Sequence, residues 1–263
     1  MAVLTEVAAG VLVATSEFAQ TTTTVLAGGD GGCLVVDPGV TVAELAALAS
    51  ALARRGLRPR AGWATHPHWD HVLWSRELGD VPRFAAPAAA AKAQAERAGM
   101  FRETSDYAPG HDPGMFGRLT ALEPGADAIP WDGPAAQVII HDGHAPGHGA
   151  VFLPGTGTLI TGDMCSDVEI PLLDLDGCDP LGDYRSGLAR LAALAGVRQV
   201  IPGHGHVGDA AEFRRRVAAD QAYLDGLERG RPFTDPRLTQ RWLRATHTTQ
   251  FQQLLQRREN NPE

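Results

Sequence analysis

The sequence predicts an α/β fold, and three observations lead to this class. Short runs rich in β-branched residues alternate along the chain with longer Ala- and Leu-rich segments at helical spacing. The 263 residues, 44% of them hydrophobic, are enough for one large α/β domain. No internal repeat or low-complexity linker divides them. We therefore expect a single domain over residues 1–263, with a charged helical C-terminal extension from about residue 209.

The first part of the chain predicts a meander followed by a helix. "GVLVATS", "TTTTVLA" and "CLVVDPG" are strand-like runs separated by turn residues within positions 10–39. Thr41 is a suitable N-cap for the helix that follows, which Gly56 ends. "AGWATH" predicts a short buried strand, and "AAPAAAAKAQAERAG" predicts a helix. Residues 99–134 are dense in Gly, Pro and Asp, so we expect a long loop or lid there.

The second part of the chain continues the alternation. "AQVIIHDG", "AVFLPG" and "TLITGD" predict three strands with turn residues between them. "DPLGDYRSGLARLAALAG" predicts an amphipathic helix, and "RQVIPGHG" predicts a strand with a polar end. The last 55 residues are strongly charged and predict mostly helix.

The composition narrows the binding partners and the cellular compartment that we expect. A formal net charge of −8 works against binding to nucleic acid or to an anionic membrane. The apolar N-terminus lacks a basic region and is interrupted by Glu6 and Gly10, so it predicts a strand rather than a signal peptide. No run approaches the ~18 apolar residues of a membrane span. The three cysteines form no C-x-x-C pair. We expect a cytoplasmic protein that acts on a small molecule; its oligomeric state is not predicted.

Side chains that can bind metal follow five of the expected strands. They are Asp37, the cluster "HPHWDH" at residues 66–71, His148 in "APGHG", Asp163 in "ITGD" and His204 in "IPGHG". Their shared position at strand ends suggests one rim of a sheet. Extended backbone has a period of two, so His66 and His68 point the same way and can hold one ion. A turn at Trp69 would direct Asp70 and His71 toward a second ion. The alternative, surface histidines beside a helix cap, explains fewer of these motifs.

In these motifs the sequence resembles the metallo-β-lactamase-fold hydrolase superfamily. "VVDPG", "THPHWDH", "PGH", "TGD" and "PGHG" appear in the order of that family, from about Thr21 to Gly208. The resemblance implies an αββα sandwich, in which two mixed β-sheets are flanked by helices, with a dinuclear metal site at one edge. It also implies the ligands: His66, His68 and His148 for the first metal, Asp70, His71 and His204 for the second, and Asp163 as the bridge. Asp37 matches a residue that orients a ligand; its alternative role is to shape the turn before Pro38.

The chemistry of such a site is hydrolysis. Two divalent ions ~3.5–4 Å apart stabilise a bridging hydroxide near neutral pH, because each ion lowers the pKa of bound water. An ion also polarises a carbonyl or phosphoryl oxygen. Asp70 is the expected catalytic residue, because it is close to that water in this family and can orient it or carry its proton. Ligands without thiolate suit two Zn²⁺ ions; iron or manganese is the alternative.

Three other histidines need to be weighed. His144 lies four residues before His148, and His206 lies two after His204, so either is an alternative ligand. The "PGH" and "PGHG" contexts favour His148 and His204. We expect His111, in the Gly/Pro-rich segment, to be solvated.

Several further residues have two interpretations. Cys165 lies two residues after Asp163 and is expected to be a core thiol, with a soft metal ligand as the alternative. Tyr107 and Tyr184 are expected to pack, with proton donation to substrate as the alternative. Trp69 and Trp74 are expected to wall the site and its adjoining core.

Comparison within the resembled family favours a small acyl substrate, namely a thioester, ester or lactone. The β-lactamases with this motif generally lack an aspartate at the bridging position, and the acyl-homoserine lactonases carry a tyrosine where this chain has Ser166. Hydroxyacylglutathione hydrolases share all seven ligands. The tRNA-processing nucleases share them too, but the acidic balance disfavours polyanions.

Two enzyme classes remain as alternatives. One is a persulfide dioxygenase-like oxidoreductase with a single iron, and the other is a phosphodiesterase of the same fold. Flavodiiron oxidoreductases differ in having a glutamate for the second histidine and a flavodoxin domain. A non-catalytic binding protein is disfavoured, because such family members usually lose ligands.

Overall fold

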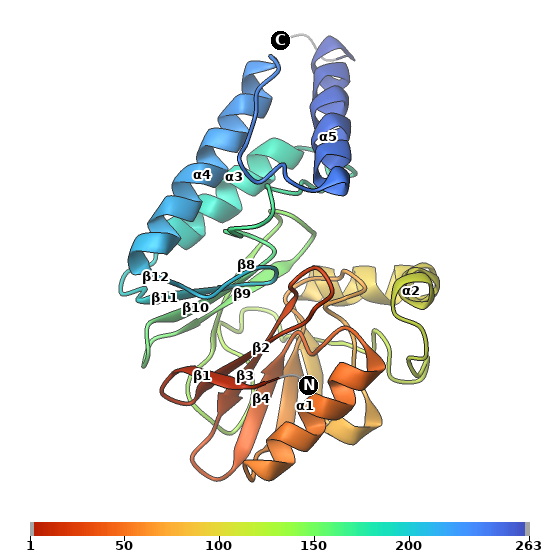
Figure 1. The fold of residues 1–263 in the computed structure, drawn as a ribbon, viewed down its shortest axis with the longest axis vertical. Coiled ribbons are helices and arrows are strands. Elements are labelled where there is room, and N and C mark those ends of the chain that lie inside the picture. Colours follow the sequence, from red (N-terminus) through yellow and green to blue (C-terminus); the bar gives the residue numbers. More distant parts are fainter. Residues whose placement is uncertain (1–2, 261–263) are drawn as a thin grey trace.

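Two β-sheets pack face to face in the computed structural model, which describes residues 3–260 (Figure 1). The seven-stranded sheet has the order β1-β2-β3-β4-β5-β6-β7, antiparallel up to β4 and parallel from β4 onward. Its strands are β1 (Thr5–Ala8), β2 (Val11–Thr15), β3 (Thr22–Ala27), β4 (Gly32–Val36), β5 (Arg58–Trp63), β6 (Arg83–Ala85) and β7 (Thr120–Ala121).

The second sheet has five strands in the order β12-β11-β10-β9-β8, of which only β10 and β11 pair in parallel. Its strands are β8 (Gln137–His141), β9 (His148–Leu153), β10 (Thr158–Gly162), β11 (Gln199–Pro202) and β12 (Gly208–Asp209).

Helices cover the outer faces of both sheets. In Figure 1, α1 lies against the seven-stranded sheet, and α3 and α4 lie over the five-stranded sheet. The helices are α1 (Val42–Arg54), α2 (Pro87–Tyr107), α3 (Pro180–Ala192), α4 (Ala210–Arg229) and α5 (Arg241–Asn260), with a short 3-10 turn, η1 (Arg76–Leu78). The αββα sandwich implied by the resemblance is confirmed.

Side chains alternate between the two faces of a strand, so one buried strand contributes to two hydrophobic clusters. In β4, Leu34 and Val36 face the other sheet and pack in one cluster with Ile160 of β10. Cys33 and Val35 face the opposite way and pack in the cluster that includes α1. All of β4 is therefore buried, as the continuous hydrophobic run in the sequence indicates.

The helix predicted after Thr41 begins with a capping box. The Thr41 hydroxyl accepts a hydrogen bond from the backbone N–H of Glu44 at 3.2 Å, and the Glu44 carboxylate accepts one from the Thr41 N–H at 2.8 Å. The same carboxylate accepts a hydrogen bond from the Ser16 hydroxyl at 2.7 Å. Gly56 follows the helix with a φ of 68°.

Helix α2 is longer than expected. It continues to Tyr107, so residues 99–107 of the predicted loop are helical. Gly99 costs roughly 1 kcal/mol in a helix relative to Ala. The neighbouring Met100 offsets this cost because it is buried in one cluster with Ala89, Ala93 and Phe116. Only residues 108–134 are therefore loop, apart from β7.

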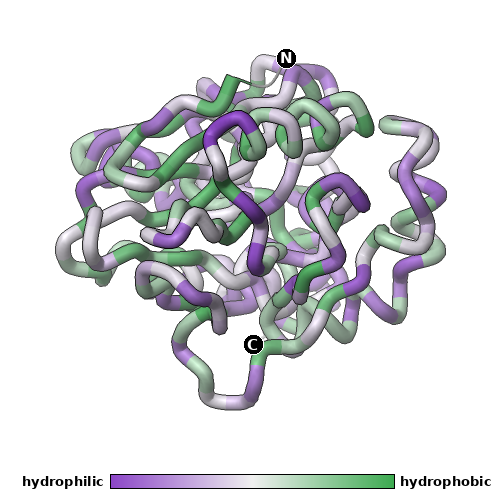
Figure 2. The backbone as a smooth tube through the Cα atoms, turned by 90° about the horizontal axis from the view of Figure 1, so that it is seen from below, coloured by the Kyte–Doolittle hydropathy of each residue, from purple (hydrophilic) through white to green (hydrophobic). Residues whose placement is uncertain are grey.

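Where the sequence predicted a strand near the N-terminus, the structure has two, β1 and β2, within residues 5–15. Hydrophobic stretches are short and interrupted along the whole trace (Figure 2). Among the described residues, no helix is long and apolar enough to cross a membrane. All three cysteines are free.

Candidate metal centre

Parallel strands from both sheets deliver polar side chains to one edge of the sandwich. Asp37 follows β4 and His66 follows β5 in the first sheet, while Asp163 follows β10 and His204 follows β11 in the second. The expected single rim is therefore corrected to an edge that two sheets share. The carboxyl ends of parallel strands lie on the same side, which explains why these side chains meet.

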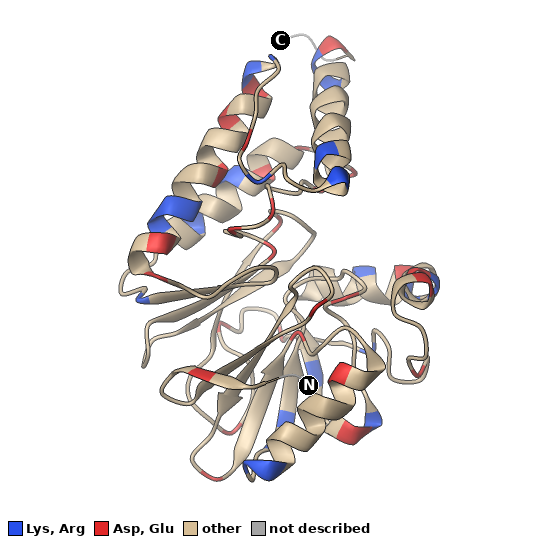
Figure 3. Ribbon diagram, in the orientation of Figure 1, with Lys and Arg blue, Asp and Glu red and all other residues tan. Residues whose placement is uncertain are grey.

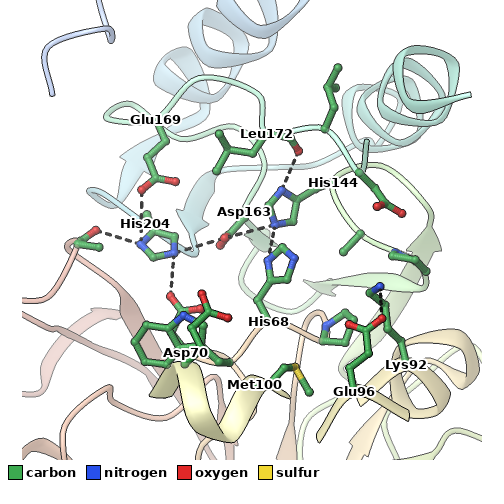
Figure 4. A pocket seen from close by; sticks show the side chains of 18 of the residues that line it. His68, Asp70, Lys92, Glu96, Met100, His144, Asp163, Glu169, Leu172 and His204 are labelled. Atoms are coloured by element: carbon green, nitrogen blue, oxygen red, sulfur yellow. Dashed lines mark hydrogen bonds and ion pairs between the residues drawn. The ribbon is translucent and has the colours of Figure 1, made fainter. Parts of the chain in front are cut away.

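Two groups of ligand-type atoms meet at this edge, and within each group all atoms lie within 4.8 Å of one another. The first group is His66, His68, His144 and Asp163, and the second is Asp70, His71 and His204. Asp163 lies between them (Figure 4). Its Oδ2 atom is 3.4 Å from His66 Nε2 and its Oδ1 atom is 3.3 Å from His71 Nε2. Both oxygens of one carboxylate thus face histidines of different groups.

The histidine rings are oriented by hydrogen bonds on their far sides. Three Nδ1 atoms have fixed acceptors: His71 donates to Asp37 Oδ2 at 2.9 Å, His144 to the Leu172 carbonyl at 2.9 Å and His204 to the Ala19 carbonyl at 3.0 Å. Thr65 orients a fourth ring. Its hydroxyl donates to Asp37 at 2.6 Å and therefore accepts from His66 Nδ1 at 2.9 Å. Each Nε2 atom is left to face the centre.

Burial and nearby carboxylates divide the histidines into two electrostatic classes. Burial lowers the pKa of His66 well below its usual value and that of His144 to about 3. Burial acts in the same direction on His71 and His204, but the carboxylates, Asp163 foremost, outweigh it and raise both pKa values well above the usual one. Burial would raise the pKa of Asp163, yet the imidazoles hold it well below the ordinary value.

The polar atoms that face the centre fit a pair of metal ions. His66 Nε2 and Asp163 Oδ1 are buried and have no hydrogen-bond partner among the described residues. Such atoms are costly in a fold unless something else satisfies them. Imidazole and carboxylate ligands without thiolate suit zinc, iron or manganese.

His144, and not the expected His148, lies in the first ligand group. His144 sits in the loop between β8 and β9 with a φ of 73°, from where its Nε2 reaches within 3.5 Å of Asp163 Oδ2. His148 already belongs to β9, and its buried ring stacks on His66 and His141 at centroid distances of 5.2 and 4.7 Å. The sequence alone does not show which histidine is the ligand, because in "GHAPGH" both His144 and His148 follow a glycine.

The structure also shows where the other candidate residues lie. His206 is exposed and pairs with Asp167 away from the centre, whereas His204 lies in the second group. Tyr184 and Cys165 are buried in the core, and burial raises the Cys165 pKa well above the usual value, as expected of a core thiol. The prediction for His111 was wrong: it is buried.

Glu169 was not singled out from the sequence. It is buried, its Oε1 atom lies 3.8 Å from His204 Nδ1, and it forms a third group of ligand-type atoms with Asp163 and His204 (Figure 4). Burial raises its pKa to about 7. No motif contains it; the only signal is an acidic residue shortly after Asp163.

A cavity of about 780 Å³ opens onto the centre between α2 and the segment that links β10 to α3. One face of α2 lines it with residues at helical spacing, namely Lys92, Glu96, Met100, Glu103 and Tyr107. Residues 172–176 line the opposite side, and Trp69 contributes to the wall, as expected. Of the predicted lid, only the helical part reaches this cavity. Trp74 is buried in the adjoining core.

Comparison with known proteins supports the fold. A crystal structure of a metallo-beta-lactamase family protein from Thermus thermophilus superposes with a TM-score of 0.66 at 22% identity, covering 95% of this chain and 92% of that one. TTHA1623, solved in a di-iron-bound form, gives a TM-score of 0.60 at 26% identity over 77% of this chain and 96% of that one.

The sequence comparisons identify the family. A hydroxyacylglutathione hydrolase of Gloeobacter violaceus is 32% identical over 196 residues, which are 72% of this chain and 65% of that protein. The chain thus matches slightly less than two thirds of its relative's length. Residues 17–204 match the model of the metallo-beta-lactamase superfamily. With this match over most of its length, the chain belongs to the metallo-beta-lactamase superfamily.

Proposed function

We propose that this chain is a metallo-hydrolase that cleaves the acyl bond of a small thioester, ester or lactone. The observation that carries the proposal is the position of Asp163, whose two oxygens face histidines of two ligand groups. A carboxylate shared between two ligand groups suits a pair of metal ions held close together. The 32%-identical relative named a hydroxyacylglutathione hydrolase supports a thioester as the first substrate to test.

Each ligand group would hold one metal ion. His66, His68 and His144 would hold the first ion, Asp70, His71 and His204 the second, and Asp163 both. Zinc is our first choice, with iron or manganese as the alternative. Two bound ions would lower the pKa of water at the site and polarise the substrate carbonyl.

Asp70 is the residue to which we assign proton handling. Its Oδ2 atom lies 3.3 Å from His204 Nε2, and its side chain lines the cavity. Burial would raise its pKa, but His71 and His204 lower it to about 2, so the group is ionised near neutral pH. An ionised carboxylate there can accept a hydrogen bond from the attacking water and keep it in line with the carbonyl.

The surroundings favour an acyl substrate over a phosphodiester. Among the described residues that line the cavity, Lys92 is the one lysine or arginine, and it is paired with Glu96 at 2.7 Å. A polyanion needs several unpaired cations. We also propose a reducing, cytoplasmic location and no nucleic-acid partner, which the free cysteines and the net charge of −8 support.

The test is a comparison of kcat/KM on a thioester, an ester, a lactone and a phosphodiester with the metal-loaded protein. We expect an acyl compound to be turned over most efficiently. Faster cleavage of bis-p-nitrophenyl phosphate than of every acyl compound would replace the proposal with phosphodiesterase activity. One tightly held iron together with persulfide oxidation would replace it with the dioxygenase class.

A further inference from the structure

Acidic residues line two opposite sides of the cavity beside the metal centre, and together we call them the acidic wall. Glu103 on α2 lines the cavity from one side, and Asp174 and Asp176 line it from the segment between β10 and α3. Figure 3 shows acidic residues in red on both of these elements. None of the three carboxylates has a lysine or arginine within ion-pair distance in the described part of the chain, whereas Glu96 is neutralised by Lys92. Three unpaired negative charges therefore face the space that a substrate would occupy.

Aromatic rings line the same cavity as these carboxylates. Trp69 and Tyr107 are stacked, with centroids 5.8 Å apart and an interplanar angle of 9°, and Phe18 meets Trp69 edge-on at 5.4 Å. All three line the cavity, as does Trp242 of α5. Tyr107 is 60% exposed and Trp242 41% exposed, whereas Trp69 is only 9% exposed. A bound molecule that covered them would remove apolar surface from water.

Carboxylates combined with aromatic faces are the chemistry that recognises organic cations. The negative face of an indole or phenol ring attracts an ammonium group, and nearby carboxylates strengthen the attraction. An anionic molecule in the same place would meet three like charges, and Lys92, the one lysine among the described lining residues, is already paired with Glu96. Glutathione carries two carboxylates and one ammonium group, so this wall opposes its net charge.

We propose that this cavity selects acyl substrates that carry a cationic ammonium group beyond the scissile bond, and that it discriminates against anionic thioesters of the glutathione type. The ammonium group would lie against the exposed ring of Tyr107, which Trp69 backs, within the field of Glu103, Asp174 and Asp176. This inference rests on the proposed acyl hydrolase function and names the substrate class of the same site.

The first test compares three acetyl thioesters that differ in the charge of the thiol. The metal-loaded full chain is assayed with acetylthiocholine (cationic), S-acetyl-N-acetylcysteamine (neutral) and S-acetylglutathione (anionic). We expect kcat/KM to fall in that order, by at least about tenfold between the first and the last. The ratio should shrink at high salt, because ions screen exposed charges. A value for S-acetylglutathione equal to or above that for acetylthiocholine would overturn the inference and leave the hydrolase function standing.

A triple variant tests whether the carboxylates of the acidic wall cause this selectivity. Neutralising the acidic wall in the triple variant Glu103→Gln, Asp174→Asn, Asp176→Asn should bring the ratio of cationic to anionic kcat/KM close to one. The matched control is Glu123→Gln, an exposed carboxylate that does not line the cavity, and it should leave the ratio unchanged. An unchanged ratio in the triple variant would show that these carboxylates do not select charge.

A binding measurement separates this inference from the proposed function. Trp69 and Trp242 line the cavity, so tryptophan fluorescence can report its occupation without turnover. Tetramethylammonium should change the emission at lower concentration than glutathione does, and Trp242→Phe should reduce the signal. Tighter binding of glutathione would reject the inference. If all three thioesters were inert while tetramethylammonium still bound preferentially, the acyl hydrolase function would fail and the cationic selectivity would remain.

Discussion

Asp37 accepts a hydrogen bond from His71 across 2.9 Å and so turns the other ring nitrogen of His71 toward the metal centre. The carboxylate is itself held by the backbone N–H of Thr65 at 2.9 Å. Asp37 has a φ of 46°, so it also forms the turn before Pro38. Both roles considered for it from the sequence are therefore present: it orients a candidate ligand and shapes the turn.

Replacing this carboxylate should weaken the second metal. Asn tolerates the positive φ of Asp37, so Asp37→Asn should fold, while losing the charge that orients His71. We expect affinity for the second ion to fall by about 10- to 100-fold. Metal content after dialysis against metal buffers measures this. The control is Asp167→Asn. Asp167 Oδ2 lies 2.8 Å from Nδ1 of the exposed His206, so this variant should leave the metal content unchanged. Equal loss in both variants would contradict the role of Asp37.

His144 and His148 should behave differently when truncated. His144→Ala removes a ring from the first ligand group and should lower bound metal from two ions toward one. His148→Ala should lower Tm, because it empties a fully buried position, yet keep both ions. Metal analysis of the two purified variants decides this. Retention of both ions by His144→Ala, with loss from His148→Ala, would restore the assignment made from the sequence.

Metal binding should release protons. In the metal-free protein the carboxylates raise the pKa of His71 and His204 well above the usual value, which favours the protonated form of these rings. His66 and His144, whose pKa values burial lowers, carry none. Loading the second site should therefore release up to two protons, and metal affinity should rise with pH. Calorimetry in two buffers of different ionisation enthalpy gives the number, and binding without proton release would contradict the pKa directions.

Gly203 is a glycine at the centre where any larger residue would displace the shared carboxylate. A Cβ atom there would lie 2.0 Å from Asp163 Oδ1. Gly203→Ala should push the shared carboxylate aside and reduce kcat by about 100-fold, since displacements of ~1 Å have effects of this size. Gly155→Ala is the matched control, because nothing lies within 4 Å of its added Cβ. Full activity of Gly203→Ala would mean that Asp163 need not hold its position.

The fold and most of the centre could be predicted because they depend on short-range patterns. The strand in "CLVVDPG" and the helix N-cap at Thr41 are local features, and both appear in the structure as expected. His66 and His68 fall into one ligand group and Asp70 and His71 into the other, as the predicted turn at Trp69 implies, and the structure has a turn over residues 69–71. That residues 1–263 form one domain stays a prediction.

What the sequence did not reveal depends on tertiary contacts. His144 reaches the centre because its loop adopts a positive φ, which the repeated Gly-His pair does not distinguish from the setting of His148. Glu169 lies beside His204 only because the segment after β10 folds back over the centre. Helix α2 continues past Gly99 because Met100 is buried, and packing of this kind overrides local propensity.

The number of metal ions needed for hydrolysis tests the central claim most directly. Metal-free protein is titrated with Zn²⁺ while hydrolysis of a thioester is followed at each addition. A dinuclear hydrolase predicts that the rate reaches its plateau at two equivalents per chain, because both ligand groups and the shared Asp163 must be filled. A plateau at one equivalent, or no hydrolysis of any acyl compound at full loading, would contradict the proposed function.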